Sequence, residues 1–92
     1  MTCTLRTRDA VSKVVLDVLQ TETGQNWITE DTHFENDLGM DGLARRTLYG
    51  PVATAVKEAG CSVRTLSPDH FQEANTVKDV VDAVWAFVKA DL

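Results

Sequence analysis

The chain has 92 residues, which is enough for one domain with a modest core and too few for two ordinary domains. Hydrophobic residues make up 43% of it and charged residues 25%, and these are the proportions of a folded domain rather than of a disordered segment. The net charge of −5 argues against a nucleic-acid partner, which requires a basic face. No apolar run is as long as a membrane span, so the sequence predicts no such span.

The two cysteines, Cys3 and Cys61, are too few for the disulfide framework that small secreted domains use. Residues 1–10 contain no apolar stretch of the kind found in a secretory signal. We therefore expect both cysteines to be free thiols in a reducing compartment, which implies a cytoplasmic protein, and we expect a monomer. A single domain is expected over 1–92, with a flexible N-terminal tail over 1–7.

The first predicted element is a helix from about Arg8 to Gln20. Its apolar residues recur with the period of one helix face, at Val11, Val14, Val15, Val18 and Leu19. The stretch that follows, 21–41, lacks a helical period and contains several acidic residues but no Lys or Arg. So long a loop fits a compact domain only if its isolated apolar residues anchor it, and these are Trp27, Ile28, Phe34 and Leu38.

A second long helix is predicted from about Asp41 to Ala59, because its apolar residues again fall on one face and Gly60 is a natural stop. These apolar residues are Leu43, Leu48, Tyr49, Val52, Val56 and Ala59. Pro51 interrupts the pattern, since it lacks the N–H that would bond the carbonyl of Thr47. We therefore expect either a kink at Gly50–Pro51 or a break at which Pro51 opens a new helix.

Two further helix starts follow. Ser67 before Pro68 is a typical N-cap pair and predicts a short helix around Phe71. Thr76 and Asp79 form a variant of the capping box, from which the last helix runs to about Ala90. No segment alternates as a strand does, so the expected fold is all-α, with three longer helices, one short helix and a long loop between the first two.

This order of elements resembles an acyl carrier protein, and the match is sharpest over 28–43. There the family has an apolar residue, a polar stretch, a phenylalanine and the motif Asp-Leu-Gly-x-Asp-Ser-Leu. The corresponding residues of this chain are Ile28, Phe34, Leu38, Gly39, Asp41 and Leu43. The resemblance implies a four-helix bundle of the kind that serves bacterial-type fatty-acid, polyketide or peptide biosynthesis.

Gly42 departs from this pattern, because the family has a serine there whose hydroxyl is esterified to 4'-phosphopantetheine. Glycine has no side-chain oxygen, and Thr47, the nearest downstream hydroxyl, is more than one helical turn away. We therefore expect no cofactor, and we interpret Asp41 and Gly42, followed by Leu43, as a helix cap rather than a retained phosphate site. The alternative is a genuine acyl carrier whose attachment site is altered at Gly42 or lies elsewhere, with 4'-phosphopantetheine as its cofactor.

The charge of the predicted second helix is also unlike the family, whose second helix is acidic and docks on basic enzymes. Here 42–64 contains Arg45, Arg46, Lys57 and Arg64 against the single acid Glu58. Arg45 and Arg46 are therefore either a solvated surface or a partner site for an acidic protein or an anionic ligand. We expect a non-acylated interaction or regulatory module of a biosynthetic system, whose partners are biosynthetic enzymes or an acidic protein.

Other candidate chemistry is sparse. His33 and His70, with the nearby Asp31 and Asp69, do not have the spacing of a metal site. Cys61 and His70 lack the surroundings that would activate a thiol nucleophile. We therefore expect no metal, no catalytic residue and no enzymatic activity, and we assign Trp27 and Trp85 to the core.

Overall fold

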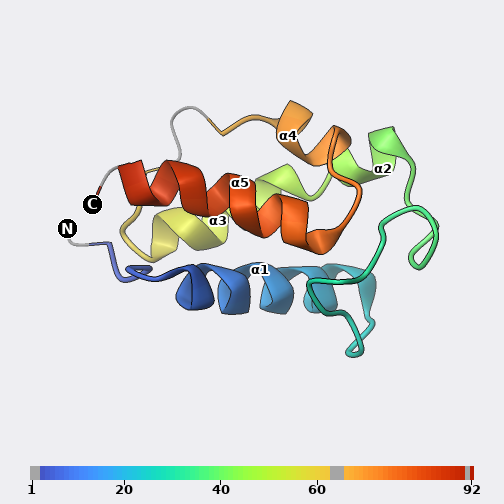
Figure 1. Ribbon diagram of the computed structural model, residues 1–92, viewed down its shortest axis with the longest axis horizontal. Helices are drawn as coiled ribbons and strands as arrows, with labels where there is room; N and C mark the ends of the chain where they lie inside the picture. The colour runs from blue at the N-terminus through green and yellow to red at the C-terminus, as the bar shows by residue number, and fades with distance from the viewer. Residues whose placement is uncertain (1–2, 63–65, 91) are drawn as a thin grey trace.

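The computed structural model describes residues 3–62, 66–90 and 92, and their helices pack side by side (Figure 1). These helices are α1 (Arg8–Thr23), α2 (Gly42–Arg46), α3 (Tyr49–Glu58), α4 (Pro68–Gln72) and α5 (Val77–Ala90). Strand-like pairing in this part of the chain is limited to one isolated bridge between His33 and Thr76, so the all-α prediction is confirmed. Of the helices described, none combines the length and apolar character needed to cross a membrane.

α1 is bounded by local signals at both ends. The hydroxyl of Thr7, the N-cap residue, accepts a hydrogen bond from the N–H of Ala10 at 3.1 Å. Gly24 takes the left-handed conformation, with a φ of 72°, and its N–H donates to the carbonyl of Gln20. α1 therefore continues about one turn past the end predicted at Gln20.

The predicted second long helix is two helices, α2 and α3, and they part at Thr47–Leu48 rather than at Gly50–Pro51. Pro51 lies within the first turn of α3, where N–H groups have no partner inside the helix, so its missing N–H costs no hydrogen bond. The backbone hydrogen bonds of α3 begin at the next residue, Val52, whose N–H donates to the carbonyl of Leu48 at 3.1 Å. The expectation that Pro51 is the first residue of the new helix is therefore wrong.

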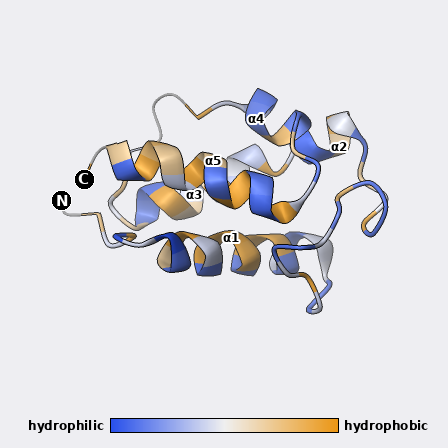
Figure 2. Ribbon diagram, viewed as in Figure 1, coloured by the Kyte–Doolittle hydropathy of each residue, from blue (hydrophilic) through white to orange (hydrophobic). Residues whose placement is uncertain are grey.

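The core lies between α1, α3 and α5. In Figure 2 the hydrophobic residues of α1 follow the edge that faces the other helices, and hydrophilic residues follow the opposite edge. The fully buried residues on the three faces are Val11, Val15, Leu19, Val52, Val56, Val80, Val81, Val84 and Val88. The predicted apolar faces are confirmed at these positions, whereas Val14 and Val18 are only half-buried at the margin.

The N-terminal segment is fixed to the bundle from Cys3 onward. Cys3 forms a disulfide with Cys61, 58 positions away, and the Cα atoms of the pair are 4.4 Å apart. Leu5 is buried in the core, and the N–H of Thr4 donates to the carbonyl of Ala59 at 2.9 Å. The prediction of free thiols is therefore wrong, because the fold brings two distant cysteines within bonding range. Residues 3–5 of the predicted tail contact the bundle through these groups. Positions 1–2 of the predicted tail lie outside the described residues.

The long loop between α1 and α2 is anchored on the start of α5. Phe34 and Ile28 are fully buried, and Leu38 is half-buried. The N–H groups of Val77 and Lys78, which open α5, donate to loop carbonyls at 3.0 and 2.9 Å. The acceptors are Thr32 and Glu30. The loop therefore supplies partners for N–H groups that the first turn of a helix leaves free.

A charged cluster ties the same loop to α1 and α5. Both oxygens of Glu30 accept from the guanidinium of Arg8, the shorter contact being 2.6 Å, and Glu30 also accepts from the hydroxyl of Ser12 at 2.7 Å. Arg8 donates in addition to Asp82 on α5 at 2.9 Å. One acidic residue of the loop is thus paired within the domain.

Two large apolar residues are not where the sequence placed them. Trp27, assigned to the core, is 49% exposed, and its indole N–H donates to the side chain of Gln25. Leu43, expected on the buried face of a long helix, is 73% exposed. The break between α2 and α3 explains Leu43, because α2 does not continue the face of α3. Trp85 is half-buried beside the core.

Candidate functional site

The turn before α2 holds the Asp-Leu-Gly residues through its own hydrogen bonds. The carboxylate of Asp37 accepts from the N–H of His33 at 2.8 Å, and the N–H of Met40 donates to the carbonyl of Phe34 at 2.8 Å. Gly39 has a φ of 65°, in the left-handed region where other residues are strained. Asp37 and Gly39 are thus explained by the shape of the turn.

Asp41 caps α2, as the sequence analysis expected. Its carboxylate accepts from the N–H of Ala44 at 2.8 Å, and its carbonyl accepts from the N–H of Arg45 at 2.9 Å. The cap uses one of the few free N–H groups of a helix that runs only from Gly42 to Arg46.

Gly42 is the first residue of α2, and the side chain of Gln72 on α4 covers it. A Cβ placed on Gly42 would stand 3.1 Å from Cγ of Gln72, 3.6 Å from its Nε2 and 3.7 Å from Nη2 of Arg45. The first of these distances is closer than ordinary van der Waals contact. A larger residue at this position therefore requires Gln72 to move.

Arg45 holds α2 against the end of α4. Its guanidinium donates to the carbonyls of Met40 at 3.0 Å and Gln72 at 3.1 Å, and more weakly to that of Phe71 at 3.3 Å. Carbonyls at the end of a helix lack partners inside it, so a cation is favoured there. Arg45 was missed as a structural residue because two of its acceptors, the carbonyls of Phe71 and Gln72, lie more than twenty-five positions further along the chain.

Arg46 fixes Gln72 over the glycine. Its Nη1 donates to the side-chain oxygen of Gln72 at 2.7 Å and forms an ion pair with Asp69. Arg45 and Arg46 are both half-buried, so neither is the fully solvated side chain that the simpler interpretation expected. Arg64, another base of this predicted segment, lies outside the described residues.

A polar hollow of about 260 Å³ lies beside the site. It is lined by His33, Glu35, Asn36, Arg45 and Asn75. The guanidinium of Arg45 already donates to backbone carbonyls, and the carboxylate of Glu35 would repel an anion. The hollow therefore does not have the charge of a phosphate site.

The structure brings Asp41, Gly42, Leu43, Arg45 and Arg46 together on α2, but it does not join the two histidines. His70 packs edge-on against Phe87, and its Nδ1 lies 3.1 Å from the N–H of Ser67, which donates to it. Among the residues described, no group of three or more His, Cys, Asp or Glu is arranged to hold a metal. Cys61 is bonded to Cys3 and is not a free nucleophile.

Comparison of the chain with protein-family models, with curated proteins and with solved structures found no match. The functional argument therefore depends on the residues of the site and on their geometry.

Proposed function

We propose that this protein is an acyl-carrier-like helical module that carries no prosthetic group and acts through protein contacts in a biosynthetic system. One observation supports this most directly. Gly42 stands immediately after a capping aspartate at the start of α2, and a Cβ placed on it would lie 3.1 Å from Cγ of Gln72. Attachment of phosphopantetheine needs a side-chain oxygen at that point, and glycine supplies none.

The residues around Gly42 therefore do not fit 4'-phosphopantetheine. Glycine has no group that a phosphodiester could join, and Arg46 holds Gln72 in place through a hydrogen bond of 2.7 Å. No step of the proposed function involves that group. The alternative is a genuine carrier whose attachment site is altered at Gly42 or lies elsewhere. Attachment elsewhere predicts a modified form of this chain.

The contacts of the two arginines bear on the choice of partner. Arg45 donates to three backbone carbonyls and Arg46 to Asp69 and Gln72, so an acidic protein docking there would compete with bonds inside the domain. We therefore assign Arg45 to holding α2 on α4. Leu43, which is exposed beside them, is the apolar group that a partner could contact at this end.

Intact-mass measurement tests the proposal. The chain is incubated with coenzyme A and a broad-specificity phosphopantetheinyl transferase, beside a serine-containing carrier protein as positive control. We expect the control to gain the mass of phosphopantetheine and this chain to keep its own mass. A gain of one phosphopantetheine on the natural chain would overturn the proposal and establish the carrier alternative.

A further inference from the structure

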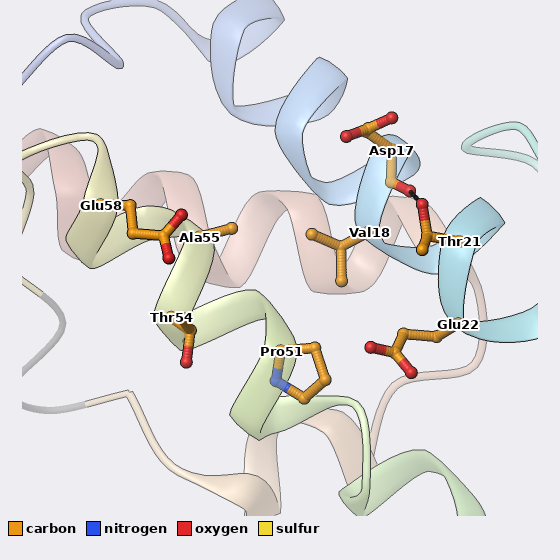
Figure 3. A pocket seen from close by; sticks show the side chains of 8 residues that line it. All are labelled: Asp17, Val18, Thr21, Glu22, Pro51, Thr54, Ala55 and Glu58. Atoms are coloured by element: carbon orange, nitrogen blue, oxygen red, sulfur yellow. Dashed lines mark hydrogen bonds between the residues drawn. The ribbon is translucent and has the colours of Figure 1, made fainter.

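An open groove of about 510 Å³ runs between α1 and α3, away from Gly42. Figure 3 shows Val18 of α1 pointing into it opposite Pro51 of α3, with Glu22 and Glu58 toward its two ends. Val18, Pro51 and Ala55 are half-buried and form its apolar floor. The volume is within the range of ligand and peptide-anchor pockets.

The charge around this groove has one sign. Asp17, Glu22 and Glu58 line it, and no Lys or Arg does. All three side chains are exposed. Within the described part of the chain, none of the three carboxylates forms an ion pair or accepts a hydrogen bond; the hydroxyl of Thr21 donates to the backbone carbonyl of Asp17, not to its carboxylate. By contrast, Glu30 of the neighbouring loop is paired with Arg8. Three uncompensated carboxylates around an apolar floor favour a cationic occupant.

A second hollow shares one lining residue with the groove. It has a volume of about 350 Å³, and Glu22 lines both hollows. Its apolar walls are Trp27, Leu38 and Met40, and Asp37 adds another carboxylate. Trp27 is the exposed tryptophan that the core does not use. Tryptophan exposed beside a hollow is typical of an interface anchor, because it buries a large area with few rotatable bonds.

We propose that this α1–α3 face binds a cationic amphipathic helix of a partner protein. The groove lies between two helices, and its α3 wall extends from Pro51 to Glu58, about 10 Å or two helical turns. A third helix fits such a groove when apolar residues at i, i+3 and i+4 contact the floor and Lys or Arg side chains flank them. The inference rests on the proposed interaction role, but the groove between α1 and α3 is lined by no residue of the Gly42 site.

The experiment uses a synthetic amphipathic helix of four turns, with leucines at i, i+3, i+4 and i+7 and lysines on both flanks. It is titrated into the isotopically labelled full chain while backbone amide resonances are followed. We expect the largest shift changes at α1 residues 17–22, at α3 residues 51–58 and at the indole N–H of Trp27. Changes confined to other surfaces would overturn the proposal.

Charge variants test whether the three carboxylates around the groove attract the peptide. The triple variant Asp17→Asn/Glu22→Gln/Glu58→Gln should weaken binding about tenfold at low salt, since each exposed charge contributes modestly. The matched control Asp9→Asn/Asp31→Asn/Glu73→Gln removes the same charge from exposed positions that do not line either hollow. Equal weakening by the control would show general attraction to an acidic protein and would overturn the proposal.

Ala55→Gln tests the floor, because it places a bulky polar side chain in the groove and leaves the net charge unchanged. It should weaken the peptide as well, and unchanged binding would contradict the geometry. A peptide with glutamines in place of its lysines should not bind, and its binding would overturn the charge argument. The mass measurement separates the two proposals, since a phosphopantetheine gain with intact groove binding would overturn only the proposed loss of the carrier role.

Discussion

Gln72 on α4 lies over Gly42 on α2, with its Cγ 3.1 Å from the point at which a Cβ on Gly42 would stand. Introducing a serine at this position therefore supplies an oxygen but brings its Cβ close to the side chain of Gln72. We expect Gly42→Ser to be modified slowly by a phosphopantetheinyl transferase, because Gln72 covers the site and Arg45 and Arg46 repel a basic enzyme surface.

Gly42→Ser/Gln72→Ala should be modified faster than Gly42→Ser, because it removes the covering side chain. The fraction of protein with added phosphopantetheine mass, followed over time, gives both rates. Rapid and complete modification of the single variant would show that neither Gln72 nor the two arginines obstructs the site.

The two neighbouring arginines should differ in their effect on stability. Arg45→Ala leaves the carbonyls of Met40 and Gln72 without their donor, and should lower the free energy of unfolding by about 1–3 kcal/mol. Arg46→Ala removes a largely exposed ion pair and should cost less than about 1 kcal/mol. Urea denaturation measures both values. Equal losses would mean that Arg45 does not hold α2 on α4.

Reduction of the Cys3–Cys61 bond should lower the free energy of unfolding by about 2–4 kcal/mol, because the unfolded chain regains the freedom of a long loop. Denaturation with and without dithiothreitol measures the change, and Cys3→Ser/Cys61→Ser should match the reduced protein. Alkylation of both thiols in native, non-reduced protein would contradict the bond. A disulfide is also the chemistry of oxidising compartments, so the argument from free thiols to the cytoplasm no longer holds.

Phe34 should be the main anchor of the long loop. Because its side chain is fully buried, Phe34→Ala should cost about 3–5 kcal/mol. Trp27→Ala is the matched control, since it removes another large aromatic of the same loop that is 49% exposed, and it should cost less than about 1 kcal/mol. Chemical denaturation measures the free energy of unfolding of both variants. A larger loss for Trp27→Ala than for Phe34→Ala would contradict the prediction.

Acid should weaken the contact between the loop and α1. The hydrogen bond from Arg8, together with that from Ser12, lowers the pKa of Glu30 below its usual 4.5. The folded state thus favours the carboxylate, and the stability that it contributes is complete above pH 4.5 and lost as the pH falls through the lowered value. Glu30→Gln should flatten this part of the curve of unfolding free energy against pH. Glu73→Gln, which lacks the Arg8 contact, is the control, and an unchanged slope in Glu30→Gln would contradict the assignment.

The helices and their buried faces were predictable because the signals are local. The valines of α1 and α5 recur at the helical period, and Ser67 with Pro68 starts α4 where the cap was expected. Phe34 was also identified, as an apolar residue isolated in a polar stretch. Periodicity and caps depend on neighbours within about one turn, so they can be read without knowledge of the fold.

The features that were wrong or missed all depend on distant contacts. The Cys3–Cys61 bond and the carbonyl acceptors of Arg45 exist only once α3 and α4 are in place. Trp27 looked like a core residue by size alone, yet the loop turns Ile28 inward and leaves Trp27 in solvent. In the candidate site, the cap at Asp41 was predictable from residue type. The contact of Gln72 with Gly42 was not, because Gln72 is on α4, thirty positions further along the chain.

The disulfide also changes how the chain behaves when it is cut. Cys3 and Cys61 close a covalent ring that contains α1, the long loop, α2 and α3, while α4 and α5 lie outside it. A single proteolytic cut in the acidic loop leaves both fragments in one molecule, which separates only after reduction. A cut between α4 and α5 leaves the last helix without a covalent link to the rest of the chain whatever the redox state, so under denaturing conditions only this cut yields separate fragments without reduction.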